Sequence, residues 1–414
     1  MVSRGMTETL SERYHDVRRR TRQIFDLIAP DAFDMRPIPL RHPLRFYEGH
    51  LASFNVGMLL QSGFLENDQQ PDLTTLFARG IDPLDTSAAD KLAIQRWPER
   101  GVVADYITRV ENEMERAFES EIDPIYLHTA VEHEEMHQET LMYLVHRVPY
   151  ELKRKPANVQ SELGQSLSSA SWIQIEAGTA QLGADPKTVP FGWDNEFPQM
   201  QADVAAFQIA SRKVSNGDYL EFIDAGGYQN EKLWTDAGWK FMREGQINGP
   251  PFWTRKDGQW QYNGSFESLP LPLDWPVYVS HIEALAFTRW RGCRLPTEAE
   301  WHRAFESAPA PQAEGDNFDF VAWNPTPVSG RDRELFQLAG NGWEWTSVPF
   351  KGFPGFKPFP HYLGYSADFF DGLHFVLKGA SPVTPAELVR PSFRNWFQDH
   401  YRYAYTAFRC ARDL

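Results

Sequence analysis

Residues 123–148, DPIYLHTAVEHEEMHQETLMYLVHRV, contain the pattern that decides the first half of the fold. Asp123 suits a helix N-cap, and Pro124 suits the first helical position that follows it. Side chains spaced at i, i+4 and i+7 form one stripe along this helix, and they are Tyr126, Ala130, His133, His137, Leu141 and Leu144. The spacing predicts a helix that ends near Val148 and buries both histidines, with most of its glutamates on the opposite side.

Three further stretches before residue 150 show the same helical periodicity. They are the basic amphipathic segment 9–29, the segment 43–62 and the segment 98–120. The second segment, PLRFYEGHLASFNVGMLLQS, places Phe46, His50, Phe54 and Met58 on roughly one face. Four amphipathic helices of this length indicate an up-and-down four-helix bundle.

The paired histidines predict a metal site in the interior of this bundle. Two imidazoles one helical turn apart can bind the same ion. His50 lies on the apolar stripe of its own helix, so the bundle can bring it to His133 and His137. Three neutral nitrogen ligands leave coordination positions open for substrate and for oxygen or water. The alternative is that these are surface histidines or core histidines satisfied by one hydrogen bond, and we assign no metal to His42, His128 or His146.

The string HEEMH also fits the H-E-x-x-H pattern of zinc proteases, in which Glu134 would be the general base. That interpretation requires a third ligand downstream and a cleft floored by strands. The predicted helix is instead followed by RKPANVQSELGQSLSSA, a polar segment without aromatic residues that is typical of a linker. We therefore expect Glu134 to lie at the helix surface or behind the ligands.

After the linker, the sequence changes to short β-like runs between long loops rich in Gly, Pro and Trp. The runs are WIQIEAG, AQLGA, WPVYVS and HFVLKGAS. One helix is predicted near 281–291, and Thr297 with Glu300 forms a capping box that opens another. The expected architecture is α+β with two domains: a four-helix bundle over 1–153, a linker over 154–170 and a second domain over 171–414.

Composition and charge exclude several classes of function. The net charge of −15 argues against a nucleic-acid partner, because phosphate binding needs a basic face. No apolar run approaches the ~20 residues of a membrane helix, and the polar N-terminus lacks the apolar core of a signal peptide. Cys293 and Cys410 cannot build a disulfide framework, so we interpret both as small buried hydrophobic residues of a cytoplasmic protein. The sequence contains no signal for an oligomeric state.

Several long motifs carry a resemblance to a known family. They include RHPLRFYEGHLASF (41–54), HEEMHQE (133–139), PFGWDNEFP, RLPTEAEWHRA, GNGWEWTSVPF, SFRNWFQ and AFRCAR. Together they resemble the EgtB-type sulfoxide synthases of ergothioneine biosynthesis. The resemblance implies a DinB-like four-helix bundle joined to a domain like formylglycine-generating enzyme, a variant of the C-type lectin fold. It also implies one non-haem Fe(II), O2 and two small-molecule substrates, hercynine (N-α-trimethylhistidine) and a thiol, either cysteine or γ-glutamylcysteine.

The same resemblance assigns roles to individual residues. It implies that His50, His133 and His137 bind the iron. In HYLGYS it implies that Tyr362 donates a proton beside the iron and that Tyr365 contacts hercynine. Within SFRNWFQ, Asn395 and Trp396 resemble contacts to the trimethylammonium histidine, because a quaternary cation favours an aromatic face. Arg79, in LFARGIDP, is a candidate clamp for the thiol's carboxylate, and the two tryptophans of GNGWEWT are expected to be structural.

Some positions depart from the family pattern and keep alternatives open. Members that use γ-glutamylcysteine carry an acid after RNW, where this sequence has Phe397, although Arg402 is a possible source of charge. The N-terminal string is closer to the branch that uses cysteine and to ovothiol-type histidine–cysteine synthases, although no segment here is expected to form the methyltransferase domain usual in the latter. A selenoneine synthase has the same architecture. Formylglycine generation requires cysteines in the segment RPSFRNWFQ, which has none, and a non-catalytic metal-binding module is the remaining alternative.

Overall fold

The computed structural model describes residues 9–78, 97–157, 159, 169–328 and 334–414. Contacts between residues divide the chain after Ala157 into two compact units. We call the part up to Ala157 the helical unit and the remainder the C-terminal unit, and each is described by itself. None of the described helices has both the length and the apolarity needed to cross a membrane.

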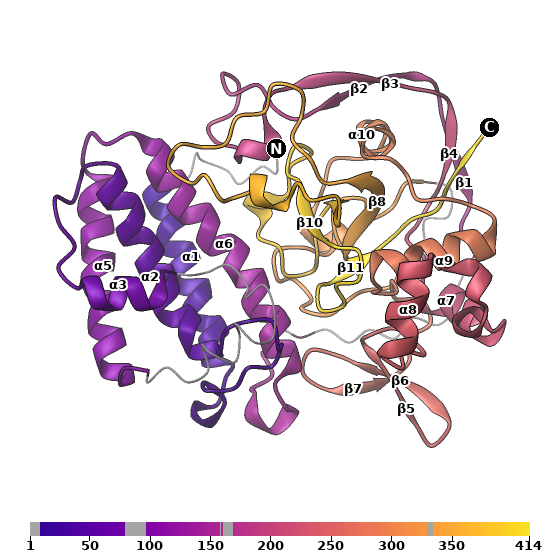
Figure 1. Ribbon diagram of the computed structural model, residues 1–414, viewed down its shortest axis with the longest axis horizontal. Coiled ribbons are helices and arrows are strands. Elements are labelled where there is room, and N and C mark those ends of the chain that lie inside the picture. Colours follow the sequence, from indigo (N-terminus) through magenta and orange to yellow (C-terminus); the bar gives the residue numbers. More distant parts are fainter. Residues whose placement is uncertain (1–8, 79–96, 158, 160–168, 329–333) are drawn as a thin grey trace. The chain divides into compact units, whose positions relative to one another are not determined.

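Four long helices pack against one another in the helical unit (Figure 1). They are α1 (Leu10–Asp26), α2 (Leu44–Gln61), α5 (Arg100–Phe118) and α6 (Pro124–Arg147). Both α1 and α2 contact α5 and α6, as expected for a bundle. The short elements are η1 (Pro30–Ala32), α3 (Pro71–Phe77) and η2 (Tyr150–Leu152). The four predicted helices are confirmed, whereas α3 was not predicted and the relation to the DinB family stays a prediction.

Local sequence explains where α6 begins and ends. The Asp123 side chain accepts a hydrogen bond from the Ile125 backbone N–H, and Pro124 occupies the first helical position. At the other end, the Lys153 ammonium donates to the carbonyls of Val145 (3.1 Å) and His146 (2.9 Å). These bonds satisfy carbonyl groups that have no partner within the helix. The helix that carries the predicted histidine pair is thus fixed at both ends.

The C-terminal unit contains four small sheets among its described residues. The four-stranded sheet has the order β10-β9-β8-β11, formed by β8 (Trp343–Pro349), β9 (His374–Lys378), β10 (Asn395–Gln398) and β11 (Thr406–Ala407). A three-stranded sheet has the order β1-β4-β12, formed by β1 (Trp172–Ile175), β4 (Phe207–Ala210) and β12 (Ala411–Asp413). The other two sheets pair β2 (Gly178–Leu182) with β3 (Met200–Val204), and join β5 (Trp253–Lys256), β6 (Gln259–Asn263) and β7 (Ser268–Pro270).

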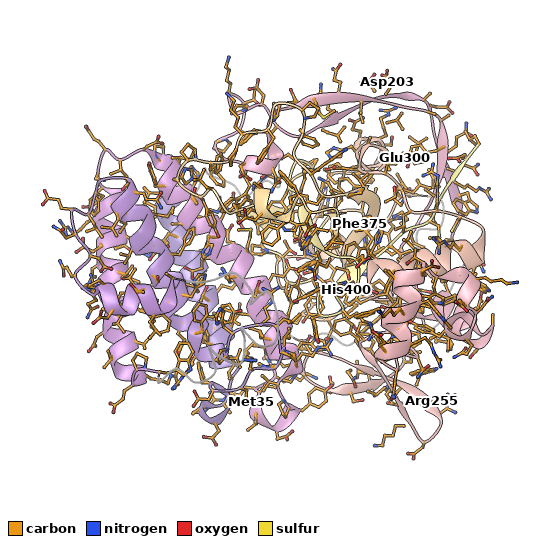
Figure 2. The ribbon with its side chains drawn as sticks, viewed as in Figure 1. Met35, Asp203, Arg255, Glu300, Phe375 and His400 are labelled. Carbon is orange, nitrogen blue, oxygen red and sulfur yellow. The ribbon has the colours of Figure 1, made fainter. Side chains whose placement is uncertain are left out.

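Short helices connect these strands. They are α7 (Asn216–Asp224), α8 (Asp236–Glu244), α9 (His281–Arg291), α10 (Glu298–Ser307) and α11 (Ala313–Asp316). Single 3₁₀ turns are η3 (Asp194–Glu196), η4 (Gly227–Gln229), η5 (Glu231–Leu233), η6 (Ala367–Phe369) and η7 (Ala386–Leu388). The predicted helix near 281–291 is confirmed as α9. The predicted Thr297–Glu300 capping box opens α10, and Glu300 is labelled in Figure 2.

A buried ion cluster explains two of the long motifs. Glu344 of GNGWEW lies 2.6 Å from the Lys213 ammonium and 2.9 Å from the Arg409 guanidinium of AFRCAR, and all three side chains are fully buried. Removing Glu344 would leave two buried cations without their shared carboxylate. Trp345 of the same motif is buried and donates its indole N–H to the Val279 carbonyl. These contacts are structural, as expected for the tryptophans of this motif.

One prediction for this unit is wrong, and two helices were not predicted. WPVYVS was predicted as a strand but forms no strand ladder, because its groups bond to several different partners. The Val277 and Val279 N–H groups donate to Val214 and Thr406 respectively, and the Thr406 hydroxyl joins the Trp345 indole at the Val279 carbonyl. Helices α7 and α8 were missed, although Ser215 with Asp218 forms a capping box at the start of α7.

Candidate metal centre and aromatic cluster

The structure brings His50 of α2 together with His133 and His137 of α6. One ligand nitrogen from each ring lies within 4.8 Å of the others. The His50 and His137 Nε2 atoms are 3.2 Å apart. Two nitrogens each about 2.1 Å from one ion, at a right angle, would lie about 3 Å apart. The donor set therefore fits a metal ion, and its residues come from the stripes that the sequence predicted.

The environment keeps these imidazoles neutral, which is the state that binds a metal. Burial lowers the pKa of His50 to about 4, and a hydrogen bond to the Phe77 carbonyl opposes this shift. Burial also lowers the pKa of His133 and His137 well below the usual value, and the neighbouring imidazoles add to the effect. His50 Nδ1 lies 2.8 Å from the Phe77 carbonyl oxygen. Its proton therefore sits on Nδ1, which leaves the Nε2 lone pair directed toward His137.

Aromatic rings hold the histidines in place. The His133 ring stacks on Phe54 with centroids 3.5 Å apart, and the His50 ring stacks on Phe46 at 5.1 Å. The buried Tyr47 ring lies 5.7 Å from His137. These contacts restrict the rotamers of all three rings, so the site is organised by α2 and α6 themselves.

The glutamates of HEEMHQE do not lie at the surface, so of the two positions expected for Glu134 the helix surface is wrong and a position behind the histidines remains. Glu134 is buried and pairs with Arg18 of α1 at 2.7 Å, while Arg13 of α1 bonds to Glu132 and Glu135. Gln138 donates its amide to the Val17 carbonyl and the Thr21 hydroxyl, also on α1. α6 thus presents histidines to α2 and polar groups to α1. Glu134 is engaged as the partner of Arg18, which disfavours the protease interpretation.

In the C-terminal unit, Tyr362 and Tyr365 belong to an aromatic cluster. Their ring centroids lie 5.6 Å apart. Tyr365 is buried between Trp193, on which it stacks at 4.0 Å, and Trp396, which meets it edge-on at 5.3 Å. Trp396 also stacks on Phe350 at 4.3 Å. Three of the residues predicted from the sequence are therefore brought together here, and Trp193 and Phe350 join them without having been predicted.

Asp194 is a third residue near this cluster that was not predicted from the sequence. It is fully buried and accepts a hydrogen bond from Ser366 at 2.6 Å. Burial raises its pKa to about 6, and the Ser366 bond opposes this shift. Burial, followed by the charge of Asp194, raises the pKa of the half-buried Tyr362 to about 12. Tyr362 is therefore a protonated phenol at neutral pH, and the only sequence signal for Asp194 was its place in PFGWDNEFP.

The RNW segment is held by a network of buried charges. Arg394 pairs with Glu298 of α10 at 2.9 Å and donates to the carbonyls of Asn195 and Lys351. Lys378 donates to the carbonyls of Pro391 and Phe393, on either side of Ser392. The network fixes the start of β10, where Asn395 and Trp396 project to opposite faces of the strand. The Asn395 side-chain oxygen accepts the Trp396 N–H at 2.8 Å.

Three further positions were considered for recognition of the thiol substrate. Arg79 lies outside the described residues. Arg402 is nearly buried and bonds to Glu283 at 3.0 Å and to the Gly249 carbonyl. Phe397 stacks on Tyr401 at 4.6 Å. Arg402 is therefore engaged within the fold, which corrects its suggested role as a free source of charge.

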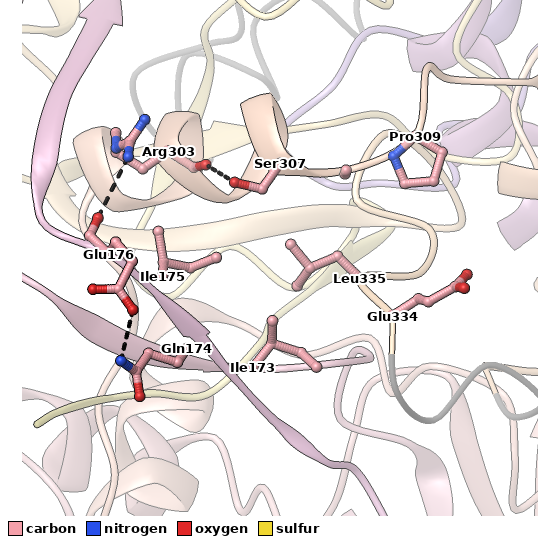
Figure 3. A pocket seen from close by; sticks show the side chains of 10 residues that line it. Ile173, Gln174, Ile175, Glu176, Arg303, Ser307, Pro309, Glu334 and Leu335 are labelled. Carbon is pink, nitrogen blue, oxygen red and sulfur yellow. Dashed lines mark hydrogen bonds between the residues drawn. The ribbon is translucent and has the colours of Figure 1, made fainter.

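The C-terminal unit also contains a cavity of about 530 Å³ (Figure 3). It is lined by strand β1, by α10 and by residues 308, 309, 334 and 335. Arg303 donates to the Glu176 carbonyl at its edge. None of the predicted site residues that the structure describes lines this cavity.

The chain is similar to a known domain family and to several named proteins. The family described as "Sulfatase-modifying factor enzyme 1-like domain" matches residues 158–328 and 331–414. A hercynine oxygenase of Mycolicibacterium smegmatis is 30% identical over 98% of this chain and 99% of its own length. A hercynine oxygenase of Mycolicibacterium thermoresistibile is 37% identical over 56% of each chain. Ergothioneine biosynthesis protein 1 of Schizosaccharomyces pombe is 29% identical over 91% of this chain and 52% of its own length.

The C-terminal unit is therefore a sulfatase-modifying factor enzyme 1-like domain, and the helical unit adds a three-histidine cluster. The whole chain belongs to the EgtB-type, hercynine oxygenase family, which confirms the resemblance drawn from its motifs. The match spans only about half the length of two of these relatives, 56% of the M. thermoresistibile protein and 52% of the fungal one.

Proposed function

We propose that the protein is an Fe(II)- and O2-dependent sulfoxide synthase of ergothioneine biosynthesis. It would join the imidazole carbon of hercynine to the sulfur of cysteine or γ-glutamylcysteine. The observation that carries this proposal is the set of three neutral imidazoles from α2 and α6, two buried and one half-buried. They occur in a chain that is 30% identical over 98% of its length to a protein named hercynine oxygenase. The proposed reaction uses the imidazole C–H, the thiol S–H and O2 to form one C–S bond, one S=O bond and water.

We propose His50, His133 and His137 as the ligands of the iron. Three nitrogen ligands without a carboxylate leave three positions of an octahedral ion open. Iron bound there would supply O2 activation and a shared site for the two substrates. The protein itself supplies the orientation: Phe77 fixes the tautomer of His50, and Phe54 fixes the His133 ring. This support by the surrounding residues is what a ligand set needs for high affinity.

We propose Tyr362 as the proton donor and Tyr365, Trp396 and Asn395 as contacts to hercynine. Tyr362, with a pKa of about 12, carries its phenolic proton at neutral pH, so it has a proton to transfer in the transition state. The rings of Tyr365 and Trp396 offer aromatic surface to a trimethylammonium group. The Asn395 amide offers N–H donors to a carboxylate, because its oxygen already accepts the Trp396 N–H.

The identity of the thiol is a finer part of the proposal. Recognition of a γ-glutamyl group needs fixed charges, and Arg402 is already paired with Glu283. Phe397 offers only a ring that stacks on Tyr401. These two observations favour cysteine over γ-glutamylcysteine. Arg79 remains a proposed partner of the thiol's carboxylate, because a guanidinium binds a carboxylate in bidentate fashion.

The experiment loads the protein with Fe(II) without oxygen, adds hercynine with cysteine or with γ-glutamylcysteine, and then admits O2. Mass spectrometry should detect the sulfoxide adduct, with cysteine as the better substrate. Tyr362→Phe should bind iron normally and form the adduct about 10²- to 10⁴-fold more slowly, the range typical of a lost proton donor. Iron-loaded protein that forms no adduct with either thiol would refute the synthase and leave a metal-binding module. Histidine or a selenium donor in place of the preferred substrates tests the ovothiol-type and selenoneine alternatives.

A further inference from the structure

The two cysteines of the chain lie in direct contact, which their separation in the sequence does not suggest. The Sγ atoms of Cys293 and Cys410 are 2.8 Å apart across 117 positions. Both were predicted from the sequence to be buried hydrophobic residues. Cys410 is buried, but Cys293 is partly exposed. Neither residue belongs to the proposed metal centre or to the aromatic cluster, so the contact calls for a separate explanation.

The backbone around both cysteines is fixed by the fold. Cys293 follows α9, which ends at Gly292 in the left-handed conformation with φ of 69°. The next residue, Arg294, exchanges two backbone hydrogen bonds with Ala411, at 2.9 and 2.8 Å. The Cys410 carbonyl accepts the Ala210 N–H of β4 at 2.8 Å. The backbone pairing of these two antiparallel segments therefore holds the two thiols close together.

The environment makes the two thiols chemically unequal. The contact with Cys410 lowers the pKa of Cys293, and the nearby Arg291 adds to this effect. The contact with Cys293 and burial raise the pKa of Cys410. A partly exposed thiol with a lowered pKa is the more reactive nucleophile toward a disulfide. The buried Cys410 thiol lies where it can displace a group that is bound to the Cys293 sulfur through a disulfide.

We propose that Cys293 and Cys410 are a reversible redox pair that a low-molecular-weight disulfide oxidises to an intrachain disulfide. The Cys293 thiolate attacks the disulfide R–S–S–R, which forms a mixed disulfide and releases R–S⁻. Cys410 then loses its proton and attacks the Cys293 sulfur, which forms the Cys293–Cys410 bond and releases the second thiolate. The two cysteines lose two electrons, and the small disulfide gains two electrons and two protons to become two thiols. This assignment holds independently of the proposed function.

The proposed bond would link the start of the C-terminal strand β12 covalently to the segment between α9 and α10. Cys410 immediately precedes β12, which pairs with the central strand of its sheet, and Cys293 lies between α9 and α10. The bond would close a loop of 117 positions that contains β8, β9 and β10. Cross-linking a long loop stabilises the folded state mainly by restricting the unfolded chain. The oxidised protein should therefore be more stable against unfolding than the reduced protein.

The test equilibrates the full-length protein in a series of reduced and oxidised glutathione mixtures, followed by acid quenching, denaturation, alkylation and intact-mass measurement. As the mixture becomes more oxidising, both wild-type cysteines should become resistant to alkylation together, and the intact mass should fall by two hydrogens. Dithiothreitol should reverse both changes. Cys410→Ser should stop at a stable glutathione adduct on Cys293. Cys293→Ser should remain unmodified under native conditions, because Cys410 is buried.

A thermal melt of the wild type provides a second measurement that needs no variant. The oxidised protein should melt several degrees above the reduced protein, and Cys293→Ser, which stays unmodified, should melt at the same temperature in either buffer. The proposal is overturned if the wild type keeps two free thiols at the most oxidising ratio. It is equally overturned if the wild type accumulates the glutathione adduct without closing the bond.

Discussion

Among single residues, Gly49 matters to the metal centre because it has no side chain. A Cβ at this position of α2 would overlap the ring of Phe77, whose carbonyl binds His50 Nδ1. Gly49→Ala should therefore displace Phe77, destabilise the protein by about 1–3 kcal/mol and weaken iron binding by about 10- to 100-fold. Fe(II) titration and urea denaturation measure the two effects.

Gly57 is the matched control for this prediction. It lies in the same helix, and an added Cβ would meet no atom within 4 Å. Gly57→Ala should gain about 0.5–1 kcal/mol from its higher helix propensity and leave iron affinity unchanged. Equal iron affinity in both variants would contradict the role given to Phe77.

Asp194 gives the C-terminal unit a defined dependence on pH. Its carboxyl has a pKa of about 6 in the folded protein, above the ordinary value of 3.8. Between these values the folded state binds the proton more strongly, so stability falls as the pH rises through this window. Asp194→Asn should therefore become more stable relative to wild type from pH 4 to pH 7, as measured by paired thermal melts. Ser366→Ala removes a bond that lowers this pKa and should move the window upward, whereas a difference independent of pH would rule out Asp194 as the titrating group.

At the scale of elements, the contact between α1 and α6 makes Glu134 a structural residue. Glu134→Gln should remove one of the two carboxylates that pair with the buried Arg18, since Glu111 also lies 2.9 Å from its guanidinium, and should cost about 1–3 kcal/mol of stability. Replacing both residues with apolar side chains of similar size, Arg18→Met with Glu134→Leu, should restore most of this loss. Urea denaturation measures both. Glu134→Gln should also retain iron and form the sulfoxide where folded, whereas loss of turnover in folded, iron-loaded protein would restore Glu134 to the chemistry.

Helices were easier to predict from the sequence than strands and long-range contacts. Helices of the helical unit follow from local spacing, and the same spacing placed His50, His133 and His137 on facing stripes. The segment WPVYVS failed because strands are defined by distant partners, and its N–H groups bond to Val214 and Thr406. Asp194 and the contact of Cys293 with Cys410 could not be predicted for the same reason. They arise from turns that only the complete fold brings together, and no periodicity marks them.

At the scale of the whole molecule, the two compact units predict that iron stabilises the chain unevenly. A ligand stabilises the state that binds it by an amount set by its concentration and affinity, and all three proposed ligands lie in α2 and α6. In hydrogen–deuterium exchange of the intact protein, anaerobic Fe(II) should slow exchange in those two helices. His50→Ala should lose both the iron and this protection, whereas His128→Ala, a change on the same α6 away from the cluster, should keep both. Full iron occupancy in His50→Ala would refute the three-histidine site, and protection confined to β1, β4 and β12 would place the metal in the C-terminal unit instead.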